Sequence, residues 1–162
     1  MTLVSSDKDL AALTMTFVAE FEADVEQVWQ LWADPRQLER WWGPPTWPAT
    51  FTRHEFTPGG ESRYHMTGPD GETPGGYWRI TELDPPTSLA LEDGFTDDAG
   101  EPLPEPPVQM RMQLAAHGDR TRMTMVSRFA DAEQLEQMLA MGMEEGMREA
   151  LAQIDGLLAQ VA

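Results

Sequence analysis

The C-terminal residues 131–161 carry the pattern that most constrains the fold of this chain. Apolar residues recur there at spacings of three and four, which predicts one amphipathic helix with a single apolar stripe. Asp131 begins this helix, and Gln134 is its partner in a capping box. The helix would run for about 28 residues, or more than about 40 Å. The stripe has to be buried, most simply against the face of a curved antiparallel sheet. It consists of Leu135, Met138, Leu139, Met143, Met147, Leu151, Ile154, Leu158 and Val161.

Strand patterns fill most of the remaining chain, with two short helices near its start. Alternating apolar residues over 13–21 predict a first strand. Asp24 then caps one helix, Asp34-Pro35 begins a second, and Gly43-Pro44-Pro45 ends it. Segregated strands and helices indicate an α+β fold in which a curved sheet grips the last helix and leaves a cavity beside it. The six further strands are predicted over residues 49–57, 61–66, 76–83, 88–94, 108–114 and 123–129.

The composition excludes several classes of function. The 162-residue chain has no cysteine, which rules out disulfides, thiolate metal sites and cysteine nucleophiles. Its formal net charge of −17 would repel nucleic acids and anionic membranes. The N-terminus has neither the basic nor the apolar region of a signal peptide, and no apolar run has the length of a membrane helix. We therefore expect a cytoplasmic protein that binds neither nucleic acid nor membrane.

Short motifs along nearly the whole chain resemble those of the Aha1-type domains, named for the activator of the 90-kDa heat-shock-protein ATPase. The motifs are Trp32-Ala33-Asp34-Pro35, Arg40-Trp41-Trp42-Gly43-Pro44, Pro58-Gly59-Gly60, Gly68-Pro69-Asp70-Gly71, Leu83-Asp84-Pro85-Pro86 and Gly142-Met143-Glu144-Glu145-Gly146-Met147. These domains belong to the START-like (SRPBCC) superfamily. The resemblance implies the helix-grip fold, with an N-terminal tail at residues 1–10 and a single domain at 11–162. It also implies that the chain can form a homodimer. In one departure from the family pattern, Met143 and Met147 stand where the family usually has tryptophan.

The cavity beside the last helix is the expected ligand site. The chain contains eleven methionines, and their flexible thioether side chains suit a lining that adapts to varied ligands. The same residues would equally suit an ordinary core, and the pattern leaves both readings open. We predict no catalytic residue and no cofactor. The predicted lining consists of Trp42, Phe51, Arg53, Glu55, Tyr64, Met66, Trp78, Met110, Met112, Met123, Met125, Met143 and Met147.

Two histidines form the other candidate site. If Gly59-Gly60 is a two-residue hairpin loop, His54 lies directly opposite His65. Such a pair could bind a metal or share a proton. No third ligand accompanies it on that face, and surface or hydrogen-bonded histidines are the alternative, so we predict no metal site.

Two glycines and two tryptophans raise questions that the sequence leaves open. A glycine inside a helix costs about 1 kcal/mol relative to alanine. Gly142 and Gly146 should therefore be compensated, either by close approach of the sheet or by room for a ligand. Adjacent helical residues point about 100° apart. We therefore predict that Trp41 and Trp42 differ clearly in exposure, with one ring buried as a corner anchor and the other facing the cavity or solvent.

Three functions are compatible with these residues. We expect a binding protein for a small hydrophobic or amphipathic molecule. The first alternative is an enzyme of the cyclase or hydrolase type, in which Glu55, Tyr64, Arg53 or the histidine pair would move protons. The second is a protein-interaction module related to a co-chaperone, which would contact its partner through exposed aromatic residues between Trp41 and Trp47.

Overall fold

The structure, a computed structural model, describes residues 2–161. Within these residues eight strands form one antiparallel sheet. The strands are β1 (Thr2–Asp9), β2 (Thr14–Phe21), β3 (Ala49–His54), β4 (Glu61–Met66), β5 (Gly75–Asp84), β6 (Ser88–Thr96), β7 (Val108–His117) and β8 (Arg120–Arg128). The helices are α1 (Val25–Ala33), α2 (Pro35–Leu38), α3 (Ala132–Ala140), α4 (Met143–Ala152) and α5 (Ile154–Val161).

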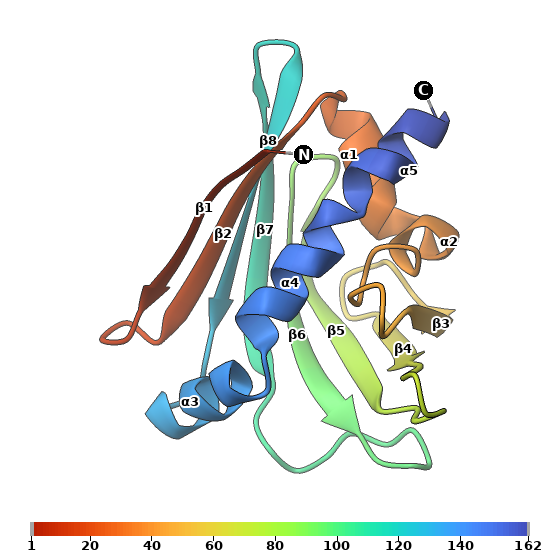
Figure 1. Ribbon diagram of the computed structural model, residues 1–162, viewed down its shortest axis with the longest axis vertical. Coiled ribbons are helices and arrows are strands. Elements are labelled where there is room, and N and C mark those ends of the chain that lie inside the picture. The colour runs from red at the N-terminus through yellow and green to blue at the C-terminus, as the bar shows by residue number, and fades with distance from the viewer. Residues whose placement is uncertain (1, 162) are drawn as a thin grey trace.

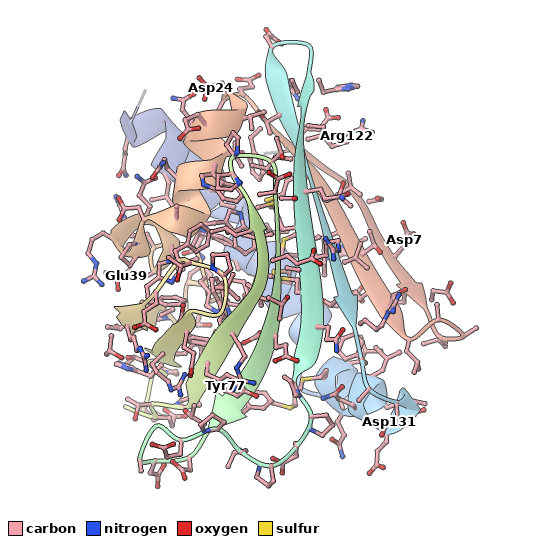
Figure 2. All side chains as sticks on the ribbon, turned by 180° about the vertical axis from the view of Figure 1, so that it is seen from behind. Asp7, Asp24, Glu39, Tyr77, Arg122 and Asp131 are labelled. Carbon is pink, nitrogen blue, oxygen red and sulfur yellow. The ribbon has the colours of Figure 1, made fainter. Side chains whose placement is uncertain are left out.

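The sheet is strongly curved, and its strand order is β1-β2-β8-β7-β6-β5-β4-β3. Helices α4 and α5 run across its concave face, while α1 and α2 lie toward one end (Figure 1). Figure 2 looks onto the outer face from behind, with Tyr77 of β5 and Arg122 of β8 labelled there. This arrangement confirms the predicted α+β helix-grip fold. No helix in the described part of the chain is long and apolar enough to cross a membrane.

Residues 1–10, expected to be a tail, contain an additional edge strand. β1 pairs antiparallel with β2, for example Lys8 with Met15. Two polar side chains of this strand contact α4. The Ser6 hydroxyl donates a hydrogen bond of 2.9 Å to Glu144 of α4, and Lys8 forms an ion pair of 3.1 Å with the same carboxylate. Backbone pairing with β2 and these contacts hold the strand in place.

The two short helices begin where the sequence predicts. Asp24 and Gln27 form a capping box at the start of α1, and the Asp34 side chain accepts a hydrogen bond from the Arg36 backbone N–H at the start of α2. Gly43 adopts a φ of 110°, and a Cβ atom there would collide with the backbone of Trp47. Only glycine fits this conformation comfortably, so the chain turns sharply into β3.

The predicted difference in exposure between Trp41 and Trp42 is wrong, because their exposed fractions are 0% and 5%. Both rings are enclosed by other aromatic side chains. Trp41 packs edge-on against Trp32 with ring centroids 4.9 Å apart, and Trp42 packs edge-on against Trp78 at the same distance. The Trp41 indole also donates a hydrogen bond of 2.8 Å to the Leu31 carbonyl. The rings do point in different directions, since Trp42 lines a cavity on the concave side of the sheet and Trp41 does not.

The single C-terminal helix of about 28 residues is also wrong, since the chain breaks it twice. Gly142 has a φ of 85°, which ends α3 and turns the chain into α4. The second break falls at Gln153, between α4 and α5. Its side-chain amide donates hydrogen bonds of 2.7 Å to the Gly43 carbonyl and 3.3 Å to the Trp41 carbonyl. These bonds link the helix break to the segment from Trp41 to Trp47, which we call the tryptophan corner.

The pairing of His54 with His65 is wrong as well. A bulge lies between Phe51 and Arg53, and His54 pairs with Ser62 instead. The connection includes residues 55–60 rather than two glycines alone, so the register shifts. His54 Nδ1 lies 2.7 Å from Ser62 Oγ, and Nε2 lies 3.0 Å from the Trp32 carbonyl oxygen. Burial lowers the pKa of His54, against opposing contributions from the Trp32 carbonyl and Asp34. This histidine connects α1 to the sheet.

Candidate ligand cavity

A cavity of about 430 Å³ lies on the concave side of the sheet. The tryptophan corner forms one wall, the inner faces of β4 to β8 form the floor, and the end of α3 with the first turns of α4 forms the roof. Small-molecule sites usually have volumes of about 300–1,000 Å³. The cavity therefore has the size of a small ligand.

The walls are mostly aromatic rings and methionine side chains. The rings belong to Trp42, Trp47, Tyr64 and Phe95. The methionines come from both the sheet and the helices, so the thioethers face each other across the space. They are Met66, Met110, Met138, Met141, Met143 and Met147.

Six of the residues predicted to line the cavity do so, and the others lie elsewhere. Those that line it are Trp42, Tyr64, Met66, Met110, Met143 and Met147. Arg53 and Glu55 are exposed beyond the bulge and form an ion pair of 2.8 Å with each other. The other five are buried in the packed core, where α1 and α5 cover the sheet. They are Phe51, Trp78, Met112, Met123 and Met125. Alternation identified the inner face correctly except beyond the bulge in β3, but it cannot say which part of that face the helices cover.

A single polar pair lies in this apolar lining. The Tyr64 hydroxyl of β4 donates a hydrogen bond of 2.8 Å to Asp93 Oδ1 of β6. The phenol has to cross β5 to reach it, and it crosses at Gly76, its partner in the sheet register. A Cβ atom at Gly76 would collide with the Tyr64 ring. Glycine at this one position therefore allows the pair to form.

The environment of this pair shifts both pKa values upward. Burial raises the pKa of Asp93 to about 7, although the hydrogen bond from Tyr64 opposes the rise. Burial also raises the pKa of Tyr64 well above its ordinary value, and the neighbouring Asp93 adds to the effect. The Trp42 indole lies near the Tyr64 hydroxyl and weakly opposes that rise, but its N–H makes no regular hydrogen bond with any described residue. Asp93 is thus a carboxyl group that changes charge near neutral pH.

Asp93 could have been found from the sequence. In β6 the inward positions are Leu89, Leu91 and Asp93, so an acidic residue occupies a position where the alternation calls for an apolar one. A carboxyl group on the buried face of a strand indicates a functional role more often than a surface carboxyl does. Ser127 also lines the cavity and shows the same signal, because it follows Met123 and Met125 on the inward side of β8, whereas no such signal marks Trp47.

Gly146 shows how α4 makes room for the cavity. This residue lies inside the helix and lines the space, and a Cβ atom added there would meet nothing within 4 Å. Close approach of the sheet is therefore not the reason for glycine at this position. The open space beside the helix is the second of the two explanations that the sequence left open. Gly142 has a separate role, because its positive φ turns the chain between α3 and α4.

Among the described residues, no group of three or more His, Asp or Glu side chains is placed to hold a metal ion. His65 pairs with Thr50 and Gly75 in the sheet, and His117 lies 3.8 Å from Glu20 at the exposed end of β7. The histidines thus lie apart from each other and from the cavity.

Comparison with known proteins identifies the family. A comparison with curated proteins found no match. The solution NMR structure of a protein from Arthrobacter aurescens is 54% identical, with a TM-score of 0.94 over 98% of this chain and 93% of that one. The crystal structure of a protein from Mycobacterium smegmatis is 46% identical, with a TM-score of 0.90 over 97% of each chain. The family model described as Activator of Hsp90 ATPase homolog 1-like protein matches residues 22–159. The chain belongs to this family.

Proposed function

We propose that this protein binds a small hydrophobic molecule in the cavity between α4 and the sheet. The observation that carries the proposal is Gly146, which leaves open space beside a helix that alanine would stabilise. An unfilled apolar cavity is itself destabilising, by roughly 20 cal/mol for each Å² of its surface. A ligand that fills the space would offset both penalties.

The lining supports a ligand held mainly by shape and apolar contact. Methionine side chains from two sides adjust to irregular shapes more readily than branched residues do. Aromatic faces of Trp42 and Trp47 add flat apolar surface. Tyr64 and Asp93 supply the polar contact that would orient the molecule.

A matched pair of glycine variants tests the proposal. Gly146→Leu places a side chain into the cavity, whereas Gly156→Leu places the same side chain on the exposed side of α5, where a Cβ atom also meets nothing within 4 Å. The probe is prodan, a neutral fluorescent naphthalene. We expect the unmodified protein and Gly156→Leu to bind it and Gly146→Leu to lose at least about tenfold in affinity, since the cavity would be filled.

Two results would refute the proposal. One is an absence of binding by the unmodified protein in fluorescence titration, in native mass spectrometry and in thermal shift with a panel of apolar compounds. The other is equal binding by Gly146→Leu and Gly156→Leu, which would place the probe outside the cavity. Circular dichroism of both variants establishes that they are folded.

An enzyme is the second candidate function, and Asp93 is the observation that favours it. A carboxyl group with a pKa of about 7 can donate and accept a proton at neutral pH, and Tyr64 could relay it. The other polar residues considered for this role lie outside the cavity, namely Arg53, Glu55, His54 and His65. Turnover of a bound compound that is abolished in Asp93→Asn, while its binding is retained, would establish catalysis over simple binding.

A co-chaperone role has no comparable support. The surface expected to carry it includes Trp41 and Trp42, which are buried, and Trp47, which is half-buried against the cavity. The described residues of this corner therefore offer no flat aromatic patch to a partner protein.

A further inference from the structure

We propose that the ligand is an apolar molecule carrying one positively charged amine, which lies against Asp93 and Tyr64 at the polar end of the cavity. This inference rests on the proposed binding function and adds to it the chemical class of the ligand. Its basis is the geometry and charge of the groups around Asp93.

Asp93 has one oxygen free to receive a ligand. Oδ1 accepts the hydrogen bond from Tyr64, whereas Oδ2 accepts none from the described residues. The buried side-chain atoms that lack a partner are the indole nitrogens of Trp32, Trp42 and Trp78, so Oδ2 is not sealed inside the protein. The Asp93 side chain belongs to the lining of the cavity. A protonated amine there would form a charge-assisted hydrogen bond.

The cavity supplies no cation of its own. None of the described residues around it is Lys, Arg or His, and Asp93 is the one carboxylate among them. The nearest basic residue on the adjacent strand, Arg79, is exposed and pairs with Glu92 at 3.5 Å on the outer face of the sheet. An ionised Asp93 therefore lacks a counter-charge until a ligand provides one, and an uncompensated buried charge is costly.

Further acidic residues lie on one side of Asp93. A second hollow of about 400 Å³, between α3 and the loop before β7, adjoins the cavity and also includes Asp93. The charged residues around that hollow are all acidic, namely Glu105, Asp131 and Glu133. With the net charge of −17, they would attract a cation and repel an anion on approach.

The cavity walls also favour a cation over a neutral polar group. Trp42, Trp47 and Tyr64 line the same cavity as Asp93, and a cation within about 6 Å of such a ring is attracted by its quadrupole. Two features would favour an anion, namely the first turn of α4 at Gly142 and Met143 and the indole N–H of Trp42, which has no acceptor among the described residues. Glu144 and Glu145 in that same turn oppose it.

Proton balance gives the binding a measurable signature. Burial raises the pKa of Asp93, so at pH 6 most of the unliganded protein carries the proton. An ammonium ligand favours the ionised carboxylate, and the proton then leaves to solvent. Tyr64 is the one other titratable group in the cavity lining, and its raised pKa keeps it protonated throughout. The acidic groups that face Asp93 from the second hollow are Glu105, Asp131 and Glu133.

Three naphthalene compounds with one ring system and different head groups test the proposal. They are 1-naphthylmethylamine, which is cationic, 1-naphthylmethanol, which is neutral, and 1-naphthylacetic acid, which is anionic. Each is titrated into the full chain at pH 8 by calorimetry and by displacement of prodan. We expect the amine to bind about tenfold more tightly than the alcohol, and the acid to bind most weakly. At pH 6, calorimetry in two buffers of different ionisation enthalpy should show proton release with the amine alone.

Two variants distinguish the effect of Asp93 on ligand preference from the effect of the general negative charge. Asp93→Asn should reduce the preference for the amine to about threefold or less while leaving the alcohol unchanged. Glu92→Gln removes the same charge from the adjacent residue, which faces the other side of the sheet, and should keep the preference. Equal affinity for amine and alcohol in the unmodified protein, tighter binding of the acid, or an unchanged preference in Asp93→Asn would each overturn the inference. In those cases prodan and the alcohol still bind, so the proposed function survives. If none of the compounds binds, both proposals fail together.

Discussion

The Tyr64 hydroxyl donates a hydrogen bond of 2.8 Å to Asp93 Oδ1 across the intervening strand β5. The two residues are 29 positions apart in the chain and meet because Gly76 leaves space for the phenol ring. Their contact places a carboxyl group, which can be neutral or negative near pH 7, at one end of an otherwise apolar cavity. In the proposed binding function, this pair would orient the ligand.

The raised pKa of Asp93 predicts how stability depends on pH. Between about pH 4 and pH 7 the folded protein keeps a proton on Asp93 that the unfolded chain has lost. The free energy of unfolding should therefore fall as pH rises through this window and level off above it. The contribution is at most about 1.4 kcal/mol per pH unit, and less where water in the cavity screens the charge.

Asp93→Asn should remove this dependence. The variant should gain stability relative to the unmodified protein from pH 5 to pH 8, as measured by urea denaturation. Glu92→Gln controls for the general relief of negative charge, because it alters the charge by the same amount on the outer face. If the free energy of unfolding of Asp93→Asn differed from that of the unmodified protein by the same amount at pH 5 and at pH 8, the prediction would be contradicted.

Two glycines around the turn into α4 should respond oppositely to alanine. Gly146→Ala should raise the free energy of unfolding by about 1 kcal/mol, because the added Cβ meets open space and alanine favours the helix. Gly142→Ala should lower it by about 1 kcal/mol, because a φ of 85° strains any residue with a Cβ atom. Thermal and urea denaturation of the two variants measure this contrast. Destabilisation by Gly146→Ala would mean that the helix packs more closely there than the structure shows.

Gly76→Ala should displace Tyr64 and destabilise the protein by about 1–3 kcal/mol, since the new Cβ would collide with the phenol ring. The same substitution in a Tyr64→Ala background should cost much less, because the colliding ring is gone. A double-mutant cycle by urea denaturation measures this coupling. Additive effects of the two substitutions would show that the ring and Gly76 are not in contact.

Gln153 should contribute more to the free energy of unfolding than an ordinary surface glutamine does. Gln153→Ala removes the hydrogen bonds to the carbonyls of Gly43 and Trp41, and should lower the free energy of unfolding by about 1–2 kcal/mol. Gln160→Ala is the matched control on α5, where the side chain accepts one exposed hydrogen bond from Arg40. Its effect should stay within about 0.5 kcal/mol. Equal effects of the two substitutions in urea denaturation would refute the proposed link between helix and corner.

The sequence predicted the elements that depend on nearby residues. Alternation over residues 13–21 matches β2, whose inward residues from Met15 to Phe21 are buried. The caps at Asp24, Asp34 and Asp131 are all present, because a cap joins groups within three residues. The motif resemblance identified the family and the helix-grip fold, since the order of many weak motifs holds information that no single motif has.

Six of the thirteen residues predicted to line the cavity do so, and five of the seven others share one cause of error, while Arg53 and Glu55 lie beyond the bulge in β3. Alternation shows which face of a strand points inward, but it does not show where α1 and α5 fill that face and where α4 leaves it open. Met110 and Met112 have the same pattern in β7, yet only Met110 lines the cavity. Trp41 and Trp42 likewise differ in direction, but their burial depends on rings brought from β5 and α1.

Local sequence patterns predicted seven of the eight described strands, the helix caps and the apolar stripe, because each of these follows from local periodicity and short-range hydrogen bonds. Tertiary structure alone decided the register of β3 on β4, the breaks in the last helix, and the meeting of Tyr64 with Asp93. Each of these depends on groups far apart in the chain. A connection over residues 55–60, longer than two glycines, was enough to separate His54 from His65, while one glycine on β5 was enough to bring Tyr64 to Asp93.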